Sequence, residues 1–458
     1  MTGTLDPGLV QQLRTIVGDG HVLVGREMTA SFAVDWTGRF SGDASAVVRP
    51  GDAVEVAAVV KSCKDSGIPL VPQGGNTGLV GGGVPLNGEI VLSLRRLSDI
   101  TDVDQAGGQL TAGAGSTVSD VRRAATTAGW DYGVDLGSRD SATIGGTVAT
   151  NAGGLHVLRY GATRGQLLGT EAVLGTGEAV SHLAELIKDN TGYDIAGLLC
   201  GSEGTLGVVT AARLRLVPPS PERAVALLAF SSTEAAVAAA SHLRRSVSDL
   251  NALELFLQAG LALVCRVSGV PLPFTKTHVA YLLVEVAGQD DRVPELGRAI
   301  AALESVAEVA VATDTPRREQ LWRYREGHTE AINTLGAPHK LDVTLPAPVL
   351  AHFINRVPHV VMEADPRATT WLFGHAGDGN VHVNVTGVAP DDLTVDERVL
   401  AYAADLGGSI SSEHGIGTAK RPWLHLNRSD AEIAVFRRIK IAFDPAGILN
   451  PNVLLPPA

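Results

Sequence analysis

The sequence PQGGNTGLVGGG, residues 72–83, organises the N-terminal half of this chain. It follows an apolar run containing Ile68, Leu70 and Val71, which predicts a buried strand, so the chain leaves a sheet and turns where side chains are almost absent. Glycine permits positive φ, and successive amides that turn inward form an anion-binding concavity for which a diphosphate is the usual guest. Neither the Lys-Ser/Thr of a P-loop nor the GxGxxG of a Rossmann unit is present, so this loop alone leaves a purely structural role open.

The composition is that of an ordinary globular protein. The chain has 458 residues, of which 45% are hydrophobic and 19% charged, and this length predicts two or three domains. The net charge of −12 argues against a nucleic-acid partner and against an anionic membrane surface, so an anionic substrate would need a local basic pocket.

Cysteine use and the start of the chain point to a reduced compartment. Cys63, Cys200 and Cys265 are widely spaced and include no CxxC, so neither a disulfide framework nor a cysteine metal site is indicated. The first residues lack a basic region followed by an apolar run, and nowhere are 18 apolar residues continuous. We expect a cytoplasmic protein without a transmembrane segment.

Two more glycine clusters follow in the first half of the chain. SATIGGTVATNAGG, residues 141–154, combines small side chains, hydroxyls and amides at a density that lets backbone lie against a flat, polar-edged ligand such as a flavin ring. CGSEGTLG, residues 200–207, precedes an apolar strand at 208–216 that stops before Pro218-Pro219. A tight turn between strands is the alternative for any one Gly-Gly pair, but it explains the whole set poorly.

After Pro219, strands and helices alternate in a repeated order. Two βαβ halves of this kind predict a ferredoxin-like sheet with helices on one face. The spacing of Ser231 and Glu234 predicts a capping box at the start of the first helix. Strands are predicted at 225–230, 252–256, 278–286 and 306–313, and the second helix at 293–305.

The chemistry is concentrated in GHAGDGNVHVN, residues 374–384. Three glycines and the Asp-Gly-Asn centre exclude a helix, so we predict a hairpin in which His375 and His382 meet across the turn, which is half of a metal site. Downstream, SSEHGIG at residues 411–417 adds Glu413. A His2Glu set with one open position is typical of catalytic zinc, although these ligands suit several divalent ions. The alternative for any single histidine is a packed or solvent-facing side chain.

A second polar group lies on a predicted helix at 319–333 and on the strand after it. Arg325 and Thr329 are four residues apart and are therefore neighbours on one helix face. Lys340 and Asp342 alternate with apolar residues, which is the pattern of a half-polar strand. Such a strand face is usually solvated, so Lys340 alone indicates no site.

Three segments of the first half resemble the FAD-binding domain of the vanillyl-alcohol oxidase superfamily: PQGGNTGLVGG, IGGTVATNAGG with the RYG that follows it, and KDNTGYDIAGLLCGSEGTLGVVT. Within the superfamily they are most similar to the FAD-linked D-2-hydroxyacid dehydrogenases, and among these to the D-2-hydroxyglutarate dehydrogenases. The resemblance runs in order from about Asp35 to the C-terminus. Three ordered motifs are far more specific than any one of them.

The resemblance implies an α+β fold in three parts and a non-covalent FAD. Residues 1–219 would form a two-subdomain FAD-binding domain, residues 220–410 a ferredoxin-like substrate or cap domain, and residues 411–458 a C-terminal segment with the EHG motif that packs back on the FAD domain. The first loop lacks the His or Cys that some relatives use to attach flavin, and Ser141 stands where related enzymes often carry Cys. The cofactor-binding residues that the resemblance implies are Pro72, Gln73, Gly74, Gly75, Asn76, Thr77, Gly78, Gly81, Gly82, Gly137, Ser138, Ser141, Gly145, Gly146, Thr150, Asn151, Gly153, Gly154, Gly201, Glu203, Gly204, Gly207 and Val208.

The same resemblance assigns roles in the second half, where the HxGDGNxHxN and EHG motifs are intact. His414 would be the catalytic base that takes the substrate's hydroxyl proton. An Arg fork meets a carboxylate bidentately while Lys adds a point charge, so the two cations would bind an acid. The implied metal ligands are His375, His382 and Glu413, with zinc as the first choice, and the implied substrate-binding residues are Arg325, Thr329, Lys340, Asn384 and His414.

The implied reaction is the oxidation of a D-2-hydroxy acid to the 2-oxo acid, with a hydride passing from C2 to flavin N5. D-2-hydroxyglutarate is the expected substrate, because a metal and two cationic side chains can hold two carboxylates, and D-lactate or glycolate is the alternative. The electron acceptor could be an electron-transfer flavoprotein or a quinone, and the choices between dehydrogenase and oxidase and between monomer and homodimer stay open. A metal-dependent hydrolase is the alternative from another class, but the chain lacks HExxH and that reading leaves the glycine clusters unexplained.

Overall fold

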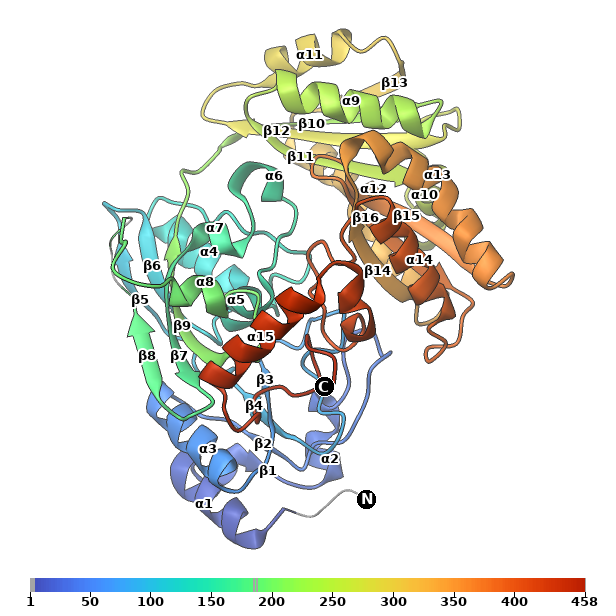
Figure 1. Ribbon diagram of the computed structural model, residues 1–458. Coiled ribbons are helices and arrows are strands. Elements are labelled where there is room, and N and C mark those ends of the chain that lie inside the picture. The colour runs from blue at the N-terminus through green and yellow to red at the C-terminus, as the bar shows by residue number, and fades with distance from the viewer. Residues whose placement is uncertain (1–4, 184–185, 187, 458) are drawn as a thin grey trace. The chain divides into compact units, whose positions relative to one another are not determined.

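The computed structural model describes residues 5–183, 186 and 188–457, and it divides into two compact units. Unit 1 contains Met1–Gly154, Tyr160–Pro218 and Glu413–Ala458, and unit 2 contains Leu155–Arg159 and Pro219–Ser412. Each unit has its own sheets and helices (Figure 1). The chain therefore enters unit 2 at Pro219, apart from a short excursion at 155–159, and returns to unit 1 at Glu413.

A four-stranded sheet in unit 1 carries the first glycine cluster. Its strand order is β1-β2-β4-β3, and β4 pairs in parallel with both β2 and β3. Helix α3 connects β2 to β3 and begins where the Asp52 carboxylate accepts the Glu55 N–H at 2.8 Å. The predicted strand before the glycine loop is confirmed, because β3 ends at Gln73. The elements are α1 (Pro7–Val17), β1 (Val22–Leu23), β2 (Ala46–Val48), α3 (Ala53–Asp65), β3 (Leu70–Gln73) and β4 (Ile90–Ser93).

A five-stranded antiparallel sheet in unit 1 supports the second and third clusters. Its order is β5-β6-β9-β7-β8, and the third cluster runs directly into β9. Helix α5 consists of IGGTVAT from the second cluster, and its apolar side chains share a core with the sheet and with α4. Helix α4 begins with a capping box between Thr117 and Asp120. The elements are β5 (Ile100–Asp104), β6 (Gln109–Gly113), α4 (Val118–Thr127), α5 (Ile144–Thr150), β7 (Leu167–Leu174), β8 (Ala179–His182) and β9 (Gly207–Arg215).

Unit 2 is built on a seven-stranded antiparallel sheet of order β13-β10-β12-β11-β15-β16-β14. The first four strands have the ferredoxin-like order, as predicted, and a hairpin and one further strand extend the sheet beside β11. One detail of the prediction is wrong: Ser232, not Ser231, caps α9, because its hydroxyl accepts the Ala235 N–H at 3.1 Å. The elements are β10 (Glu222–Phe230), α9 (Thr233–Ser246), β11 (Leu250–Leu257), β12 (Ala280–Gly288), α11 (Val293–Ala301), β13 (Val306–Ala312), β14 (His339–Thr344), β15 (Thr369–His375) and β16 (Asn380–Thr386).

Helices cover both faces of this sheet, whereas the sequence predicted helices on one face only. Helices α10 (Gln258–Ser268) and α12 (Thr315–Asn333) share a core with Leu227, Phe256 and Phe373 of the sheet. Helix α14 (Thr394–Asp405) lies against the opposite face, where Asp396 pairs with His339 of β14, and α13 (Ala347–Ala364) contacts α14. Side chains alternate along a strand, so Lys340 and Asp342 lie on the α12 side.

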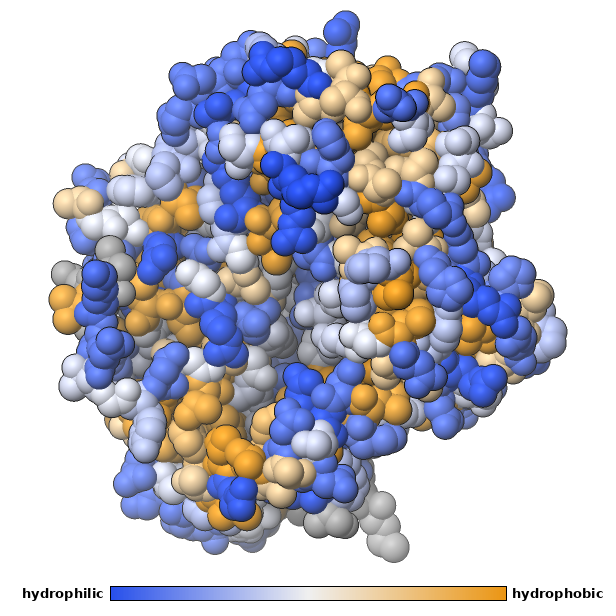
Figure 2. All heavy atoms as spheres, turned by 45° about the horizontal axis from the view of Figure 1, so that its top comes forward, coloured by the Kyte–Doolittle hydropathy of each residue, from blue (hydrophilic) through white to orange (hydrophobic). Residues whose placement is uncertain are grey.

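The surface of the protein mixes hydrophobic and hydrophilic side chains. On the face that Figure 2 presents, hydrophobic residues occur in groups separated by hydrophilic ones. Isolated exposed hydrophobic side chains, such as Tyr193 at 94% exposure, are common in globular proteins. Within the described ranges, each helix is too short or too polar to cross a lipid bilayer.

Candidate active site

The first two glycine clusters lie directly against each other in unit 1. A Cβ on Gly75 would lie 1.9 Å from the carbonyl O of Ser141, and one on Gly74 would lie 2.1 Å from Oγ1 of Thr143. Arg95 also holds this loop, because its Nε donates to the Gly74 carbonyl and its Nη2 to the Gly75 carbonyl, each at 3.0 Å. The close approach of the Ser141 backbone therefore requires glycine at position 75, and the Thr143 side chain leaves little room for a Cβ at position 74.

Two buried hydroxyl groups beside these clusters lack hydrogen-bond partners. Oγ1 of Thr143 and Oγ of Ser116 make no hydrogen bond within residues 5–183, 186 and 188–457. Ser116 lies beside the second cluster, since its carbonyl accepts the Ile144 N–H at 2.9 Å. Buried hydroxyls normally find a partner. The two clusters therefore fit a cofactor that lies against bare backbone and brings polar atoms of its own.

The third cluster is tied to the C-terminal segment by Glu203. This buried residue has a left-handed backbone, with φ 54°, and its carboxylate accepts the N–H groups of Ile416 and Gly417, each at 2.7 Å. Nδ2 of Asn450 donates to the carbonyls of Glu203 and Gly82 at 2.8 and 2.9 Å. Glu203 thus fixes the segment that follows Glu413. The family resemblance implies only a cofactor-binding role for this residue.

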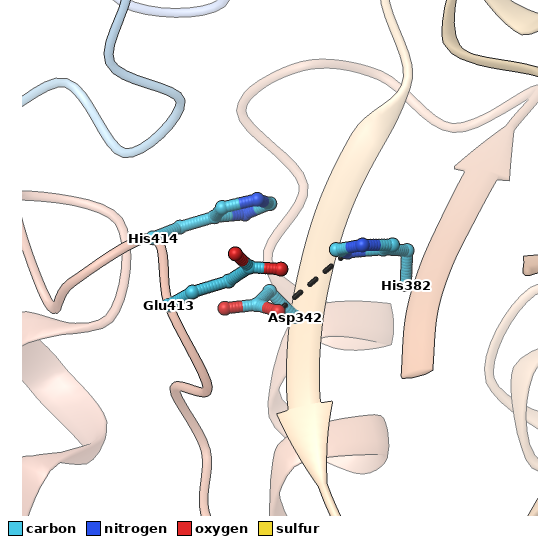
Figure 3. Close-up of side chains that lie close together, drawn as sticks. All are labelled: Asp342, His382, Glu413 and His414. Carbon is cyan, nitrogen blue, oxygen red and sulfur yellow. Dashed lines mark ion pairs between the residues drawn. The ribbon is translucent and has the colours of Figure 1, made fainter. Parts of the chain in front are cut away.

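Four charged or titratable side chains lie on the α12 face of the unit 2 sheet, on four neighbouring strands. Strand pairing places Glu254 opposite His375 and Asp342 opposite His382. The hairpin prediction is confirmed, because β15 and β16 pair and the rings of His375 and His382 meet at 5.3 Å with an interplanar angle of 82°. Nδ1 of His375 lies 2.6 Å from Oε1 of Glu254. Nδ1 of His382 lies 3.6 Å from Oδ1 of Asp342, as Figure 3 shows for these two side chains. Each imidazole therefore has a carboxylate beside its Nδ1.

Asp342, in the edge strand β14, is held in place by two other residues of unit 2. Its Oδ1 accepts from Nδ2 of Asn380 at 2.6 Å, and its Oδ2 accepts the Ser412 N–H at 3.0 Å. Ser412 is the last residue of unit 2, and Glu413 and His414, which Figure 3 also labels, follow it directly in the chain. Within unit 1, Oε2 of Glu413 accepts the N–H of Gly154, the last glycine of the second cluster, at 3.0 Å.

Arg325 projects from α12 and is nearly buried, with 6% of its surface exposed. Its guanidinium carbon lies 4.6 Å from the centre of the Phe373 ring, and its Nε lies 2.7 Å from Oε2 of Glu254. Its two terminal Nη groups pair with none of the described residues.

Burial and the neighbouring Arg325 lower the pKa of His328 to about 3, so that imidazole stays neutral in the core. Thr329, one turn beyond Arg325, is half-buried.

Lys340 and Asn384 face each other across β14 and β16. Burial lowers the pKa of Lys340 to about 8, because the charged ammonium loses water. Nδ2 of Asn384 is buried and has no hydrogen-bond partner within the described part of the chain. The strand that alternation alone predicts to be half-polar is therefore buried, and its Lys340 and Asp342 side chains lie on the same face as His375 and His382.

Sequence reasoning missed Glu254 as a member of this group. It is 1% exposed and lies in the strand LNALELFL, where it is the single charged residue. A lone carboxylate in an apolar strand is a signal that the sequence did offer, because charged residues are seldom fully buried unless they are paired. Its two partners lie far away along the chain, and no local pattern identifies them.

Two family models match this chain. The model described as "FAD binding domain" covers residues 44–182, and the one described as "FAD linked oxidases, C-terminal domain" covers residues 220–454. The chain belongs to the FAD-linked oxidase family. It is therefore an FAD-linked oxidoreductase, and the glycine clusters at 72–83 and 141–154 fall within the matched FAD-binding domain.

Relatives and solved structures agree with this membership. D-2-hydroxyglutarate dehydrogenase of Xanthomonas citri pv. viticola is 39% identical over 434 residues, which cover 92% of this chain and 91% of the relative. The mitochondrial D-2-hydroxyglutarate dehydrogenase of Arabidopsis thaliana is 33% identical over 463 residues, 99% of this chain and 82% of the relative. The structure of 4-ethylphenol oxidase from Gulosibacter chungangensis, an isoeugenol complex, has a TM-score of 0.79 over 98% of this chain and 97% of its own at 18% identity. The predicted α+β fold of the vanillyl-alcohol oxidase type is thus confirmed.

Proposed function

We propose that this FAD-linked oxidase family member is a metal-dependent dehydrogenase that oxidises D-2-hydroxyglutarate to 2-oxoglutarate. The observation that carries the proposal is the nearly buried Arg325 guanidinium, whose terminal nitrogens are unpaired among the described residues, on the sheet face that bears His375 and His382. A guanidinium of this kind suits a substrate carboxylate, which it can bind bidentately. The two relatives described above carry this enzyme's name.

The metal would be held by His375, His382 and Glu413. In both imidazoles a carboxylate lies beside Nδ1, an arrangement that leaves Nε2 as the ligating atom and resembles the carboxylate–histidine pairs of zinc proteins. Glu413 follows Ser412 directly in the chain, and the Ser412 N–H is bound by the Asp342 carboxylate. Two imidazoles and one carboxylate with an open position suit catalytic zinc as the first choice of divalent ion.

The protein's own side chains would bind and orient the acid and move one proton. The chemistry that the two groups would supply when bound is a hydride acceptor for C2 of the substrate, at N5 of FAD, and a Lewis acid for the 2-hydroxyl oxygen, at the divalent metal. Arg325 and Lys340 would hold the carboxylates, with Thr329 and Asn384 as hydrogen-bonding partners, and His414 would take the hydroxyl proton. Two cationic side chains together with the metal suit a dicarboxylate, which favours D-2-hydroxyglutarate over D-lactate or glycolate.

The FAD would be bound without a covalent bond. The glycine clusters, from Pro72 to Gly82 and from Ser141 to Gly154, would line it, and neither contains His or Cys. The unpartnered hydroxyls of Thr143 and Ser116 support this placement. The electron acceptor in the proposal is an electron-transfer flavoprotein or a quinone, and the homodimer and the cytoplasmic location stay predictions.

The test is the visible spectrum of the purified, metal-replete protein, recorded without oxygen before and after D-2-hydroxyglutarate is added. We expect a yellow flavin spectrum that bleaches, because the flavin is reduced. A yellow protein that bleaches with D-lactate or glycolate but not with D-2-hydroxyglutarate would contradict the substrate and leave the reaction intact. Rapid oxygen consumption with release of hydrogen peroxide would identify an oxidase instead of a dehydrogenase.

The pKa of Lys340 predicts an alkaline limit to substrate binding. Below pH 8 the ammonium is protonated and binds a carboxylate, and above its pKa of about 8 it becomes neutral. We therefore expect kcat/KM for D-2-hydroxyglutarate to fall by up to about tenfold per pH unit above pH 8, since kcat/KM reports the free enzyme. Lys340→Met is expected to have a low kcat/KM that does not show this fall. An unchanged kcat/KM in that variant would exclude Lys340 from the substrate site.

A further inference from the structure

Glu254 is a buried carboxylate between a proposed metal ligand and a proposed substrate-binding residue. Its Oε1 lies 2.6 Å from Nδ1 of His375, and its Oε2 lies 2.7 Å from Nε of Arg325. The first contact is a hydrogen bond, and the second is an ion pair by distance that lacks the alignment of a hydrogen bond. Antiparallel pairing sets Glu254 directly opposite His375, so the backbone itself fixes their separation.

We infer that Glu254 is a positioning residue that fixes the metal ligand His375 and the carboxylate-binding Arg325 at the same time. The inference rests on the proposed function and extends it, because it assigns one residue to both the metal and the substrate half of the site. Neither family membership nor the motifs of the sequence point to Glu254.

The first arm of Glu254 sets the tautomer of His375. An ionised carboxylate can only accept hydrogen bonds, so Nδ1 of His375 carries the proton and Nε2 carries the lone pair. That is the tautomer a ligand needs when it binds through Nε2, and a carboxylate behind the imidazole also raises its basicity as a ligand. Loss of this arm lets the ring rotate or take the other tautomer, which presents an N–H group to the metal.

The second arm of Glu254 orients Arg325. Glu254 occupies the Nε side of the guanidinium, and the Phe373 ring lies under its plane at 4.6 Å. With one edge and one face occupied, the terminal nitrogens are left for a bidentate carboxylate. The negative charge of Glu254 also offsets the cost of burying the guanidinium when no substrate is bound.

Glu285 is a matched control in the neighbouring strand β12, two residues along from Leu283, which lies opposite Glu254. Glu285 in β12 is 4% exposed, accepts from Nδ2 of Asn251 at 2.5 Å and accepts from Nε1 of Trp322 at 2.7 Å. Trp322 is on α12, one turn before Arg325, so Glu285 anchors the same helix as Glu254 does. Among the residues that the structure describes, Glu285 contacts Asn251, Trp322, His156 and Arg223, and none of these is a proposed metal ligand or substrate-binding residue. Substitution of Glu285 therefore distinguishes a structural effect on α12 from an effect on the site.

The experiment compares the flavin-loaded protein with Glu254→Gln and Glu285→Gln. Zinc affinity is measured by competition with a chromophoric chelator, and KM and kcat for D-2-hydroxyglutarate are measured at saturating zinc. Glutamine can satisfy one partner of Glu254 but not both, since its NH2 group repels whichever donor it faces. We expect Glu254→Gln to weaken zinc binding by about 10- to 100-fold, the usual effect of removing a carboxylate behind a ligating histidine. We expect KM to rise more than kcat falls, and both quantities to stay within twofold of wild type in Glu285→Gln.

Equal zinc affinity in Glu254→Gln and in wild type would overturn the inference and leave the proposed function standing. Equal losses in both variants would also overturn it, because they would reflect a loosened α12. A wild-type protein that binds no divalent ion would show instead that the metal half of the proposed function is wrong. If Glu254→Gln does not fold, Glu254→Asp replaces it, since the shorter side chain keeps the charge but cannot span both partners, and the same loss of zinc affinity is expected.

Discussion

Gly75→Ala is expected to give a folded protein that has lost most of its FAD. The new Cβ would lie 1.9 Å from the carbonyl oxygen and 2.8 Å from the carbonyl carbon of Ser141, and both are backbone atoms that cannot rotate away. The first glycine cluster must then move off the second. Overpacking of this kind typically costs about 1–3 kcal/mol, which corresponds to roughly a 5- to 150-fold weaker FAD if the cost falls on the binding site.

The measurement is the flavin content per chain after purification, together with the FAD affinity of the deflavinated protein. Gly20→Ala is the control in unit 1, because Gly20 lies outside the glycine clusters, a Cβ there would meet nothing within 4 Å and its φ is not positive. Far-UV circular dichroism shows whether each variant is folded. Equal flavin content in the two variants would show that contact between the clusters does not shape the cofactor site.

His414→Ala is expected to lower the rate constant of flavin reduction by about 10²- to 10⁴-fold, the usual contribution of a positioned general base. The residues that flank His414 are held by backbone hydrogen bonds: Ser412 to Asp342 in unit 2, and Ile416 to Glu203 in unit 1. Removal of the imidazole should therefore leave the path of the chain unchanged and delete only the proton acceptor.

The rate is measured by anaerobic stopped-flow mixing of the flavin-loaded, zinc-replete protein with D-2-hydroxyglutarate. His425→Ala is the control, since this histidine of the same C-terminal segment is exposed and its Nδ1 lies 3.0 Å from the Pro422 carbonyl oxygen, away from the proposed site residues in the chain. Zinc content is measured in both variants, because loss of metal would also slow the reaction. A His414→Ala protein that holds zinc and reduces its flavin at the wild-type rate would exclude His414 as the base.

The sequence predicts those elements whose formation depends on neighbouring residues, such as turns, hairpins and helix caps. The Asp-Gly-Asn turn predicts the hairpin of His375 and His382, and the repeated strand–helix order after Pro219 predicts the ferredoxin-like strands. The sequence predicts the capping residue of α9 one position too early, because Ser231 and Ser232 are both good caps and only the backbone geometry distinguishes them.

Contacts made by the fold as a whole could not be predicted in the same way. Glu254 and His375 are separated by 121 positions in the chain, and their meeting depends on β11 pairing with β15 rather than with another strand. The burial of Lys340 and Asp342 likewise depends on distant parts of the chain, such as β16, which pairs with β14, and Ser412, whose N–H binds Asp342, whereas strand alternation alone suggested a solvated face. The ion pair between Arg325 and Glu254 could not be read from the helix that carries Arg325.

The hydrogen bond from the Gly154 amide to Glu413 has a further consequence for how the enzyme is assembled. Gly154 adopts φ +94° and belongs to a cluster that lines the proposed flavin site, while Glu413 is the proposed third metal ligand. A displacement of the Gly154 backbone would also disturb the Glu413 carboxylate, and loss of a flavin bound as proposed would be one cause of it. If both groups bind as proposed, they are thermodynamically linked, and by reciprocity each changes the affinity of the protein for the other by the same factor. Deflavinated protein should hold its metal loosely, and protein stripped of metal should release its flavin more readily.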